Sequence, residues 1–251
     1  MTLPPFTKHY ETLERAAGAV RHYRWIKEHA KPLRQPALHE IGPASLAFER
    51  VEGRSVRPDD LPRMAELLGR AHGAAWRSDL QSASLGTPHH FNDGTPFDDY
   101  LGPRAIALRR RHVQGYLPNK VALYAMLGLL EETAQGPLAF YKDSNPRNFI
   151  ITAAGDIVTV DTDDLSLAPM GYDLAKLIAT LHLTYGPLTD QAVNAALCAY
   201  NTAAGCYGSR LDATDRGRLD DFLALHAVLT APYVGRNGYR WPLRSHLRGT
   251  L

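Results

Sequence analysis

Two short segments near the middle of the sequence carry residue types that suit metal-assisted chemistry. Asp143 and Asn148 lie five positions apart in one segment, YKDSNPRN, and Asp161 and Asp163 lie in the other, VDTDD. Two β-branched runs between these segments, joined by an Ala-Ala-Gly turn, predict a β-hairpin over 149–160. Because a hairpin brings the start of its first strand next to the end of its second, we expect Asn148 and Asp161 to meet.

These side chains suit phosphoryl transfer. An asparagine and an aspartate offer the hard oxygen ligands that Mg²⁺ prefers, with phosphate and water completing its coordination. A further aspartate close by can orient an attacking hydroxyl and accept its proton. The alternative is a purely structural acidic turn that caps the hairpin.

Three motifs in chain order resemble the aminoglycoside phosphotransferase and choline kinase-like family, which has the protein-kinase-like fold. The family's H-G-D-x-x-x-x-N loop is similar to Y-K-D-S-N-P-R-N here, and its D-x-D metal loop is similar to D-T-D. Its Y-D-L-A helix start is similar to residues 172–175. The resemblance covers residues 6–183 well. For the later part of the chain it extends only to the type of element, which is helical.

The resemblance implies an α+β, protein-kinase-like two-lobed fold with a reduced N-terminal lobe and a mainly helical C-terminal lobe. We expect residues 1–52 to form the nucleotide-binding N-lobe and residues 53–251 to form the C-lobe, with the catalytic hairpin and the acceptor site. Hydrophobic periodicity and breaker residues predict the elements of both lobes: strands over 6–10, 37–41 and 45–53, helices over 11–30, 59–78, 172–183, 190–205 and 212–234, two helices within 104–136, and a long loop over 79–103.

The family's catalytic and metal-binding roles carry over position by position. Asp143 would be the catalytic base, and Asn148 and Asp161 would hold Mg²⁺. Asp163 would hold a second ion or its water. Asp173, near the start of the following helix, would support the catalytic loop rather than touch substrate.

The nucleotide-binding residues come from the N-lobe and the catalytic loop. Lys8, in the strand-like FTKHY, takes the place of the lysine that contacts the α- and β-phosphates; the alternative is a solvated strand lysine. The backbone of Glu49, Arg50 and Val51 would meet the adenine edge. Asn145 is expected to face the transferred phosphate.

The sequence departs from the family pattern in two places. Tyr141-Lys142 replaces His-Gly; the Tyr141 hydroxyl could bond the metal-loop backbone, and the charge of Lys142 would depress the pKa of the base. Only seven residues precede Lys8, too few for two strands and a phosphate-covering loop. Either the N-lobe is naturally reduced, the sequence is truncated, or Lys8 is not the phosphate lysine. Its glutamate partner is open, with Glu11 and Glu14 as candidates.

An aromatic, arginine-containing segment follows the last predicted helix. Tyr233, Arg236, Tyr239 and Trp241 could form part of an acceptor pocket, or they could pack as a C-terminal tail with the charges in water. The last 16 residues hold four arginines and no acidic side chain. A polycationic aminoglycoside needs an acidic pocket, so this composition favours a neutral or anionic acceptor.

Composition argues against several other function classes. The net charge is +2 with no block of five like charges, which does not favour nucleic acid as a partner. The longest apolar stretch, VALYAMLGLL, is too short to cross a membrane. Two cysteines and no secretory signal predict a cytoplasmic protein without a disulfide framework.

The sequence therefore predicts a phosphotransferase that uses Mg²⁺ and ATP, or GTP, to phosphorylate a hydroxyl of a small molecule. By resemblance, an antibiotic is the leading acceptor class. Two alternatives stay open: a non-catalytic, nucleotide-binding pseudokinase, suggested by the missing upstream strands, and a metabolic kinase of a sugar or amino alcohol.

Overall fold

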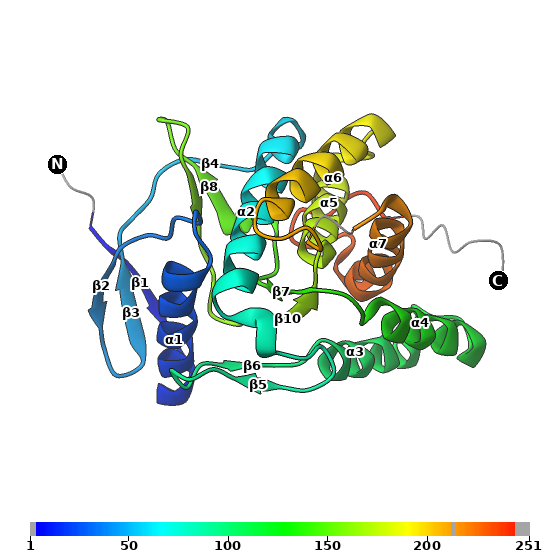
Figure 1. Ribbon diagram of the computed structural model, residues 1–251, viewed down its shortest axis with the longest axis horizontal. Helices are drawn as coiled ribbons and strands as arrows, with labels where there is room; N and C mark the ends of the chain where they lie inside the picture. The colour runs from blue at the N-terminus through cyan, green and yellow to red at the C-terminus, as the bar shows by residue number, and fades with distance from the viewer. Residues whose placement is uncertain (1–3, 212–213, 244–251) are drawn as a thin grey trace.

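A small antiparallel sheet lies at one end of the molecule and a larger, mostly helical part occupies the rest (Figure 1). The computed structural model describes residues 4–211 and 214–243. The sheet has the strand order β1-β3-β2, with β3 in the centre. Its strands are β1 (Phe6–His9), β2 (Leu38–Ile41) and β3 (Ser45–Phe48).

Helix α1 (Leu13–His29) joins this sheet to the helical part. Ala19 and Val20 pack against Leu46 of β3 in a small apolar cluster of their own. Trp25 and Ile26, one to two turns later, are fully buried in the main core. Because α1 buries apolar side chains on both sides, it fixes the sheet against the helical part.

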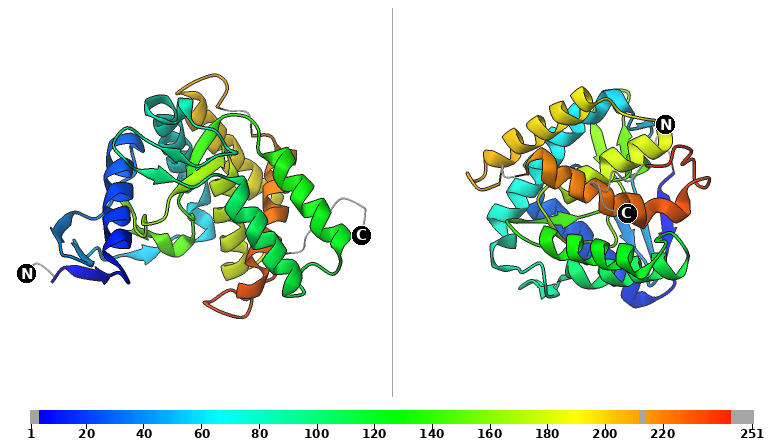
Figure 2. Two further views of the ribbon diagram at one scale, coloured as in Figure 1. Left: turned by 90° about the horizontal axis from the view of Figure 1, so that it is seen from below. Right: turned by 90° about the vertical axis from the view of Figure 1, so that its right-hand side faces the viewer.

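The helical part is built from long helices with well-defined starts. The side chains of Asn119, Thr189 and Asp215 cap their helices by accepting a backbone N–H three residues on. The views of Figure 2 place α3 and α4 at the end far from the N-terminal sheet. The helices are α2 (Leu61–Ser78), α3 (Leu101–Val113), α4 (Lys120–Thr133), α5 (Tyr172–Tyr185), α6 (Asp190–Gly205) and α7 (Arg216–Thr230).

Two small sheets hold the segments with the candidate chemistry. Strand β8 (Phe149–Ile151) pairs with β9 (Ile157–Thr159) and β4 (Arg54–Ser55), and β7 (Leu138–Tyr141) pairs with β10 (Ser166–Pro169). The loop from β7 to β8 and the loop from β9 to β10 therefore bridge the same two sheets. This nested pairing places the two loops side by side, although nearly twenty residues separate them in the chain.

Most predicted elements are confirmed, and the exceptions are short. The strand expected over 45–53 ends at Phe48, and the helix expected over 212–234 is described from Arg216 to Thr230. The loop expected over 79–103 contains a small hairpin of β5 (His89–His90) and β6 (Pro96–Phe97), and α3 already starts at Leu101. Strands β7 and β10 were not predicted. The lobe boundary at residue 52 stays a prediction.

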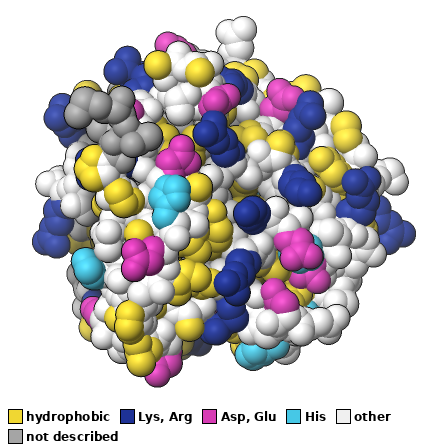
Figure 3. Space-filling model, turned by 90° about the vertical axis from the view of Figure 1, so that its left-hand side faces the viewer, with side chains coloured by type: hydrophobic (Ala, Val, Ile, Leu, Met, Phe, Trp, Pro, Cys, Tyr) yellow, Lys and Arg dark blue, Asp and Glu magenta, His cyan; other side chains and the backbone are white. Residues whose placement is uncertain are grey.

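The surface carries both signs of charge. On the face that holds the N-terminal sheet, Lys and Arg side chains are interspersed with Asp and Glu around a central band of hydrophobic ones (Figure 3). Among the described residues, none of the helices is long and apolar enough to cross a membrane.

Candidate active site

The two loops between the small sheets share an unusual backbone feature. Asp143 has φ +60° and Asp161 has φ +59°, in the left-handed region that non-glycine residues rarely adopt. Asn237 is the third such non-glycine residue in the described chain. Strained residues of this kind concentrate at functional sites, and here two of the three are the aspartates singled out from the sequence.

Asp173 accepts buried hydrogen bonds from the loop between β7 and β8, residues 142–148, which the sequence predicts to be the catalytic loop. Its Oδ1 accepts from the backbone N–H of Ser144 at 2.8 Å, and its Oδ2 accepts from the Ser144 hydroxyl at 2.7 Å. Asp173 and Ser144 are both almost fully buried. The prediction that Asp173 supports the loop is confirmed, and the support fixes the residue that follows Asp143.

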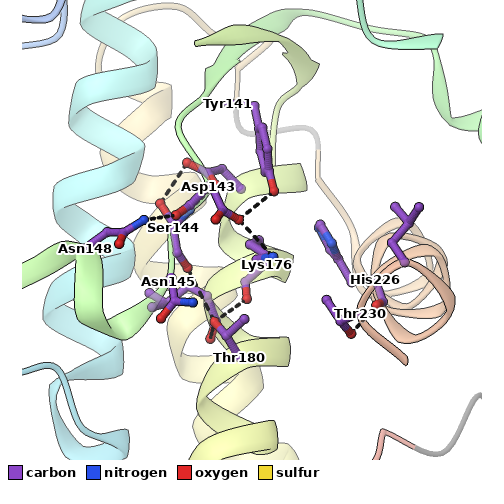
Figure 4. Close-up of polar contacts among 12 residues, drawn as sticks. Tyr141, Asp143, Ser144, Asn145, Asn148, Lys176, Thr180, His226 and Thr230 are labelled. Atoms are coloured by element: carbon purple, nitrogen blue, oxygen red, sulfur yellow. Dashed lines mark hydrogen bonds and ion pairs between the residues drawn. The ribbon is translucent and has the colours of Figure 1, made fainter. Parts of the chain in front are cut away.

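One oxygen of the Asp143 carboxylate receives two donors. The hydroxyl of Tyr141 donates to Oδ1 at 2.8 Å, and the Nζ of Lys176 on α5 lies 2.8 Å from the same atom (Figure 4). The prediction that Tyr141 would bond the metal-loop backbone is therefore wrong, because its hydroxyl is used on the aspartate. Within the described residues Oδ2 accepts no hydrogen bond.

The charges around Asp143 keep its carboxyl ionised. Burial raises its pKa, but the ion pair with Lys176, the Tyr141 hydroxyl and the charge of Lys142 together hold the pKa below its usual range. Lys142 lowers the pKa of Asp143, as expected, but its effect is weaker than that of Lys176. Its own side chain is buried, with Nζ 4.2 Å from the centre of the Phe149 ring.

The predicted hairpin forms, and it places Asn148 opposite Val160, the residue before Asp161. Strand register pairs Phe149 with Thr159, and the backbone N–H of Val160 donates to the Asn148 carbonyl at 2.9 Å. The Asn148 side-chain Nδ2 donates to the carbonyl of Asp143 at 2.9 Å. This bond fixes the amide so that its Oδ1, which bonds no described residue, is free to act as a ligand.

Lys8 lies between the two aspartates of the second loop. Its Nζ is 2.6 Å from Oδ1 of Asp161 and 2.5 Å from Oδ2 of Asp163. Partial burial lowers the pKa of Lys8, but the hydrogen bonds and charges of these carboxylates outweigh it and raise the pKa overall. Neither Glu11 nor Glu14, the candidates from the sequence, forms an ion pair with Lys8 in the described chain.

The geometry around Lys8 fits a magnesium ion. The ammonium group shows that oxygens of Asp161 and Asp163 converge on one small cation, and Asn148 lines the same cavity. No cluster of three or more His, Cys, Asp and Glu side chains suits a metal among the described residues. Two carboxylates and one amide are nevertheless the limited donor set that Mg²⁺ uses when phosphates and water supply the remaining ligands.

A first cavity of about 500 Å³ opens over these ligands. Its lining includes Lys8, Asn148, Asp161 and Asp163, and also the predicted nucleotide-binding segment from Glu49 to Val51. Much of the lining is apolar or aromatic, which suits a planar ring system such as a nucleobase. The residues that form this part of the wall are Phe6, Tyr23, Pro36, Phe48, Val51, Ile150 and Val160.

A second cavity of about 650 Å³ lies on the Asp143 side of the catalytic loop. Asp143 and Lys176 line it, and so does Asn145, whose Nδ2 donates to the Tyr239 hydroxyl at 2.5 Å. Asn145 thus does not line the first cavity, where the sequence interpretation would place a nucleotide-binding residue. Its role toward the phosphate stays a prediction.

The C-terminal residues divide between the cavity and the surface. Tyr233 and Tyr239 line the second cavity, whereas Arg236 and Trp241 do not. Trp241 is half exposed and its backbone N–H donates to the carbonyl of Leu183. Of the four tail arginines, those at 244 and 248 lie outside the described residues.

Comparison with known proteins decides the family. Residues 2–209 match the sequence profile of the phosphotransferase enzyme family. The chain belongs to this family. The prediction that the protein is an enzyme of the phosphotransferase type is therefore confirmed. A search of curated proteins gave no match to this phosphotransferase.

Solved structures show the fold of the phosphotransferase. Aminoglycoside phosphotransferase APH(3'')-Id from Streptomyces rimosus, solved with ADP and streptomycin, is 19% identical with a TM-score of 0.58, over 90% of this chain and 87% of that one. Macrolide 2'-phosphotransferase MphH from Brachybacterium faecium is 14% identical with a TM-score of 0.58, over 93% and 80%. Choline kinase LicA from Streptococcus pneumoniae is 13% identical with a TM-score of 0.56, over 90% and 75%. The predicted α+β, two-lobed kinase-like fold is confirmed.

Three further cations of the phosphotransferase site were not singled out from the sequence. Arg147 lines both cavities, and no carboxylate of a described residue lies within 4 Å of its guanidinium. Lys176 pairs with Asp143 across 33 positions of sequence, and Arg104 lines the second cavity from α3. Only Arg147 carried a local signal, because it lies in the catalytic loop one residue before Asn148.

Proposed function

We propose that this phosphotransferase transfers the γ-phosphoryl group of a nucleoside triphosphate to a hydroxyl of a small molecule. The observation that carries the proposal is the placement of two cavities on either side of one loop. Asn148 and Asp161 face the first cavity, Asp143 faces the second, and Arg147 borders both. A donor in the first cavity and an acceptor in the second would meet at this loop.

The first cavity would hold the donor. Asn148, Asp161 and Asp163 would hold magnesium, which when bound neutralises phosphate charge. When the nucleotide binds, the Lys8 ammonium would leave one or both of its aspartate partners and bind phosphate oxygens instead. The backbone from Glu49 to Val51 would bond the base edge. The relative from Streptomyces rimosus was solved with ADP, which supports a nucleotide donor, ATP or GTP.

The second cavity would hold the acceptor hydroxyl against Asp143. Oδ2 would accept the hydroxyl proton, while Tyr141 and Lys176 on Oδ1 orient the carboxylate and keep it ionised. The Arg147 guanidinium would stabilise the charge of the transferring group between the two cavities. Asn145 would position the acceptor through the hydroxyl of Tyr239.

The acceptor class proposed first is an antibiotic that phosphorylation inactivates. The similar structures of an aminoglycoside phosphotransferase solved with streptomycin and of a macrolide 2'-phosphotransferase support this proposal. A polycationic aminoglycoside fits poorly, because Arg104, Arg111, Arg147 and Lys176 all line the second cavity. The cytoplasmic location, where nucleoside triphosphates are abundant, stays a prediction.

Turnover against a panel of hydroxylated compounds tests the proposal. Purified protein is incubated with Mg²⁺, ATP or GTP, and antibiotics, sugars and amino alcohols, and phosphorylated products are measured by mass spectrometry. Expression in a sensitive host then shows whether phosphorylation confers resistance. Product without resistance would favour a metabolic kinase. Nucleotide binding without product from any compound would favour the pseudokinase and refute the proposal.

A further inference from the structure

The second cavity contains a buried arginine without a counter-charge. Arg104, in the first turn of α3, has 7% of its surface exposed and lines the cavity. No carboxylate of a described residue lies within 4 Å of its guanidinium. Burying an unpaired charge is costly in free energy. Neighbouring groups must therefore stabilise the guanidinium, and a buried cation in a cavity is a candidate for ligand binding.

Three tyrosine rings supply part of that environment. The guanidinium carbon of Arg104 lies 4.6 Å from the ring centre of Tyr100, 4.9 Å from that of Tyr141 and 4.7 Å from that of Tyr172. Its hydrogen bonds go to neutral oxygens, among them the Tyr100 carbonyl at 3.0 Å and the Ser166 hydroxyl at 3.4 Å. Cation–π contacts offset part of the burial cost but leave the positive charge uncompensated.

A second buried arginine on α3 reinforces this charge. Arg111 lies seven residues after Arg104, so both occupy the same face of the helix two turns apart. Arg111 donates to the carbonyl of Leu229 and to the side chain of Gln114, which are again neutral acceptors. Together the two arginines make the α3 wall of the cavity positive.

Three carboxylates line the same cavity, and among the described residues none of them forms an ion pair with Arg104 or Arg111. Lys176 already neutralises Asp143. The other two carboxylates, Asp98 and Asp164, belong to the segments that flank His22, whose ring nitrogens contact the carbonyls of Pro96 and Asp163. The α3 wall of the cavity therefore keeps its positive charge. This wall lies close to the proposed base, because the Tyr141 side chain contacts both Arg104 and Asp143.

We propose that Arg104 binds an oxyanion group, a carboxylate or a phosphate, on the acceptor molecule, and that this phosphotransferase therefore prefers anionic acceptors. The proposal rests on the assignment of the second cavity as the acceptor site. A guanidinium binds both oxyanions in a bidentate manner. The acceptor would place its anionic group against Arg104 and Ser166 and its hydroxyl at Oδ2 of Asp143, about one tyrosine side chain away.

Matched acceptors that differ only in charge test this preference. One series is phenyl β-D-glucuronide, phenyl β-D-glucoside, its 6-phosphate and its 6-amino-6-deoxy analogue; a second series is N-acetylhomoserine and its amide. Binding to the full-length protein with a non-hydrolysable ATP analogue is measured by calorimetry. In at least one series the wild-type protein should bind the anionic member at least tenfold more tightly than the neutral one, and the amine most weakly. The order of carboxylate and phosphate shows which oxyanion fits.

Variants of α3 assign the preference to Arg104. Arg104→Gln should abolish the difference between anionic and neutral members, Arg104→Lys should keep part of it, and exposed Arg109→Gln should leave it intact. If Arg104→Gln does not fold, the wild-type comparison alone decides. Equal or weaker binding of every anionic member would overturn the proposal. Phosphorylation with a preference for neutral or cationic compounds would refute it while the phosphotransferase function stands. Anion binding without phosphorylation of any compound would instead refute the function.

Discussion

The Nζ of Lys176 lies 2.8 Å from Oδ1 of Asp143, the same oxygen to which the Tyr141 hydroxyl donates. One oxygen of the proposed base thus has two donors, and the other accepts no hydrogen bond from a described residue. The two oxygens would have separate roles. The contacts to Oδ1 orient the carboxylate and favour its ionised form, and Oδ2 is free to accept the proton of the acceptor hydroxyl. Lys176 therefore acts on the reaction through Asp143.

Replacing Lys176 with Met is expected to shift the acidic limb of the pH–rate profile to higher pH. Burial raises the pKa of Asp143, and the charge of Lys176 is the main influence that lowers it. Without this charge the carboxyl takes up its proton at less acidic pH, so the ionised base is lost earlier as the pH falls. The measurement is kcat/KM against pH; Lys176→Arg, which keeps the charge, should stay near wild type. An acidic limb at the same pH in Lys176→Met would contradict this role.

Lys8→Met is expected to change magnesium binding and turnover in opposite directions. Without nucleotide, the ammonium of Lys8 occupies the space between Asp161 and Asp163. Its removal should tighten Mg²⁺ binding to the free protein, measured by calorimetry, because no cation competes for the carboxylates. Turnover should fall by about tenfold or more, because a phosphate contact is lost. Exposed Lys27→Met serves as the control, and unchanged values for both quantities would remove Lys8 from the site.

Arg147→Met is expected to lower kcat by about 100-fold while KM for the nucleotide changes little. The Arg147 side chain borders both cavities, where charge develops on the transferring group. Steady-state kinetics with nucleotide and acceptor varied in turn separates the two constants. Arg70→Met removes an exposed arginine that pairs with Glu66 on α2 and should behave as wild type. A loss confined to KM would instead assign Arg147 to ground-state binding.

Two glycine-to-alanine substitutions are expected to affect stability with opposite sign. Gly69 on α2 faces α6, and a Cβ there would overlap the backbone oxygen of Tyr200. Gly69→Ala should therefore lower the free energy of unfolding by about 1–3 kcal/mol. Gly128 on α4 has open space around it, so Gly128→Ala should raise this free energy by about 0.5–1 kcal/mol. Urea unfolding measures both, and equal effects would contradict the close packing of α2 on α6.

The parts of the site set by local pattern could be predicted from the sequence. The β-branched runs and the glycine turn define the hairpin, and the hairpin register alone brings Asn148 next to Asp161. Asp173 follows from its place at the start of α5, directly behind the catalytic loop.

The parts that depend on distant segments could not be predicted. Lys8 and Asp161 are 153 positions apart, and nothing in the local sequence pairs them. Strands β7 and β10 have four residues each and form only because they pair with each other. Arg104 looks like a surface residue in a helix with other arginines. Two of the three tyrosines around it, Tyr141 and Tyr172, come from the distant elements β7 and α5.

The most direct test is product formation by wild type and Asp143→Asn, with the best acceptor from the compound panel. The asparagine keeps the size of the side chain but cannot accept the hydroxyl proton, so the rate of product formation should fall by about 10²–10⁴-fold. Nucleotide affinity should be unchanged, and Asp156→Asn, at the exposed hairpin turn, should match wild type. Equal product formation by wild type and Asp143→Asn would contradict the assignment of Asp143 as the base and with it the proposed mechanism.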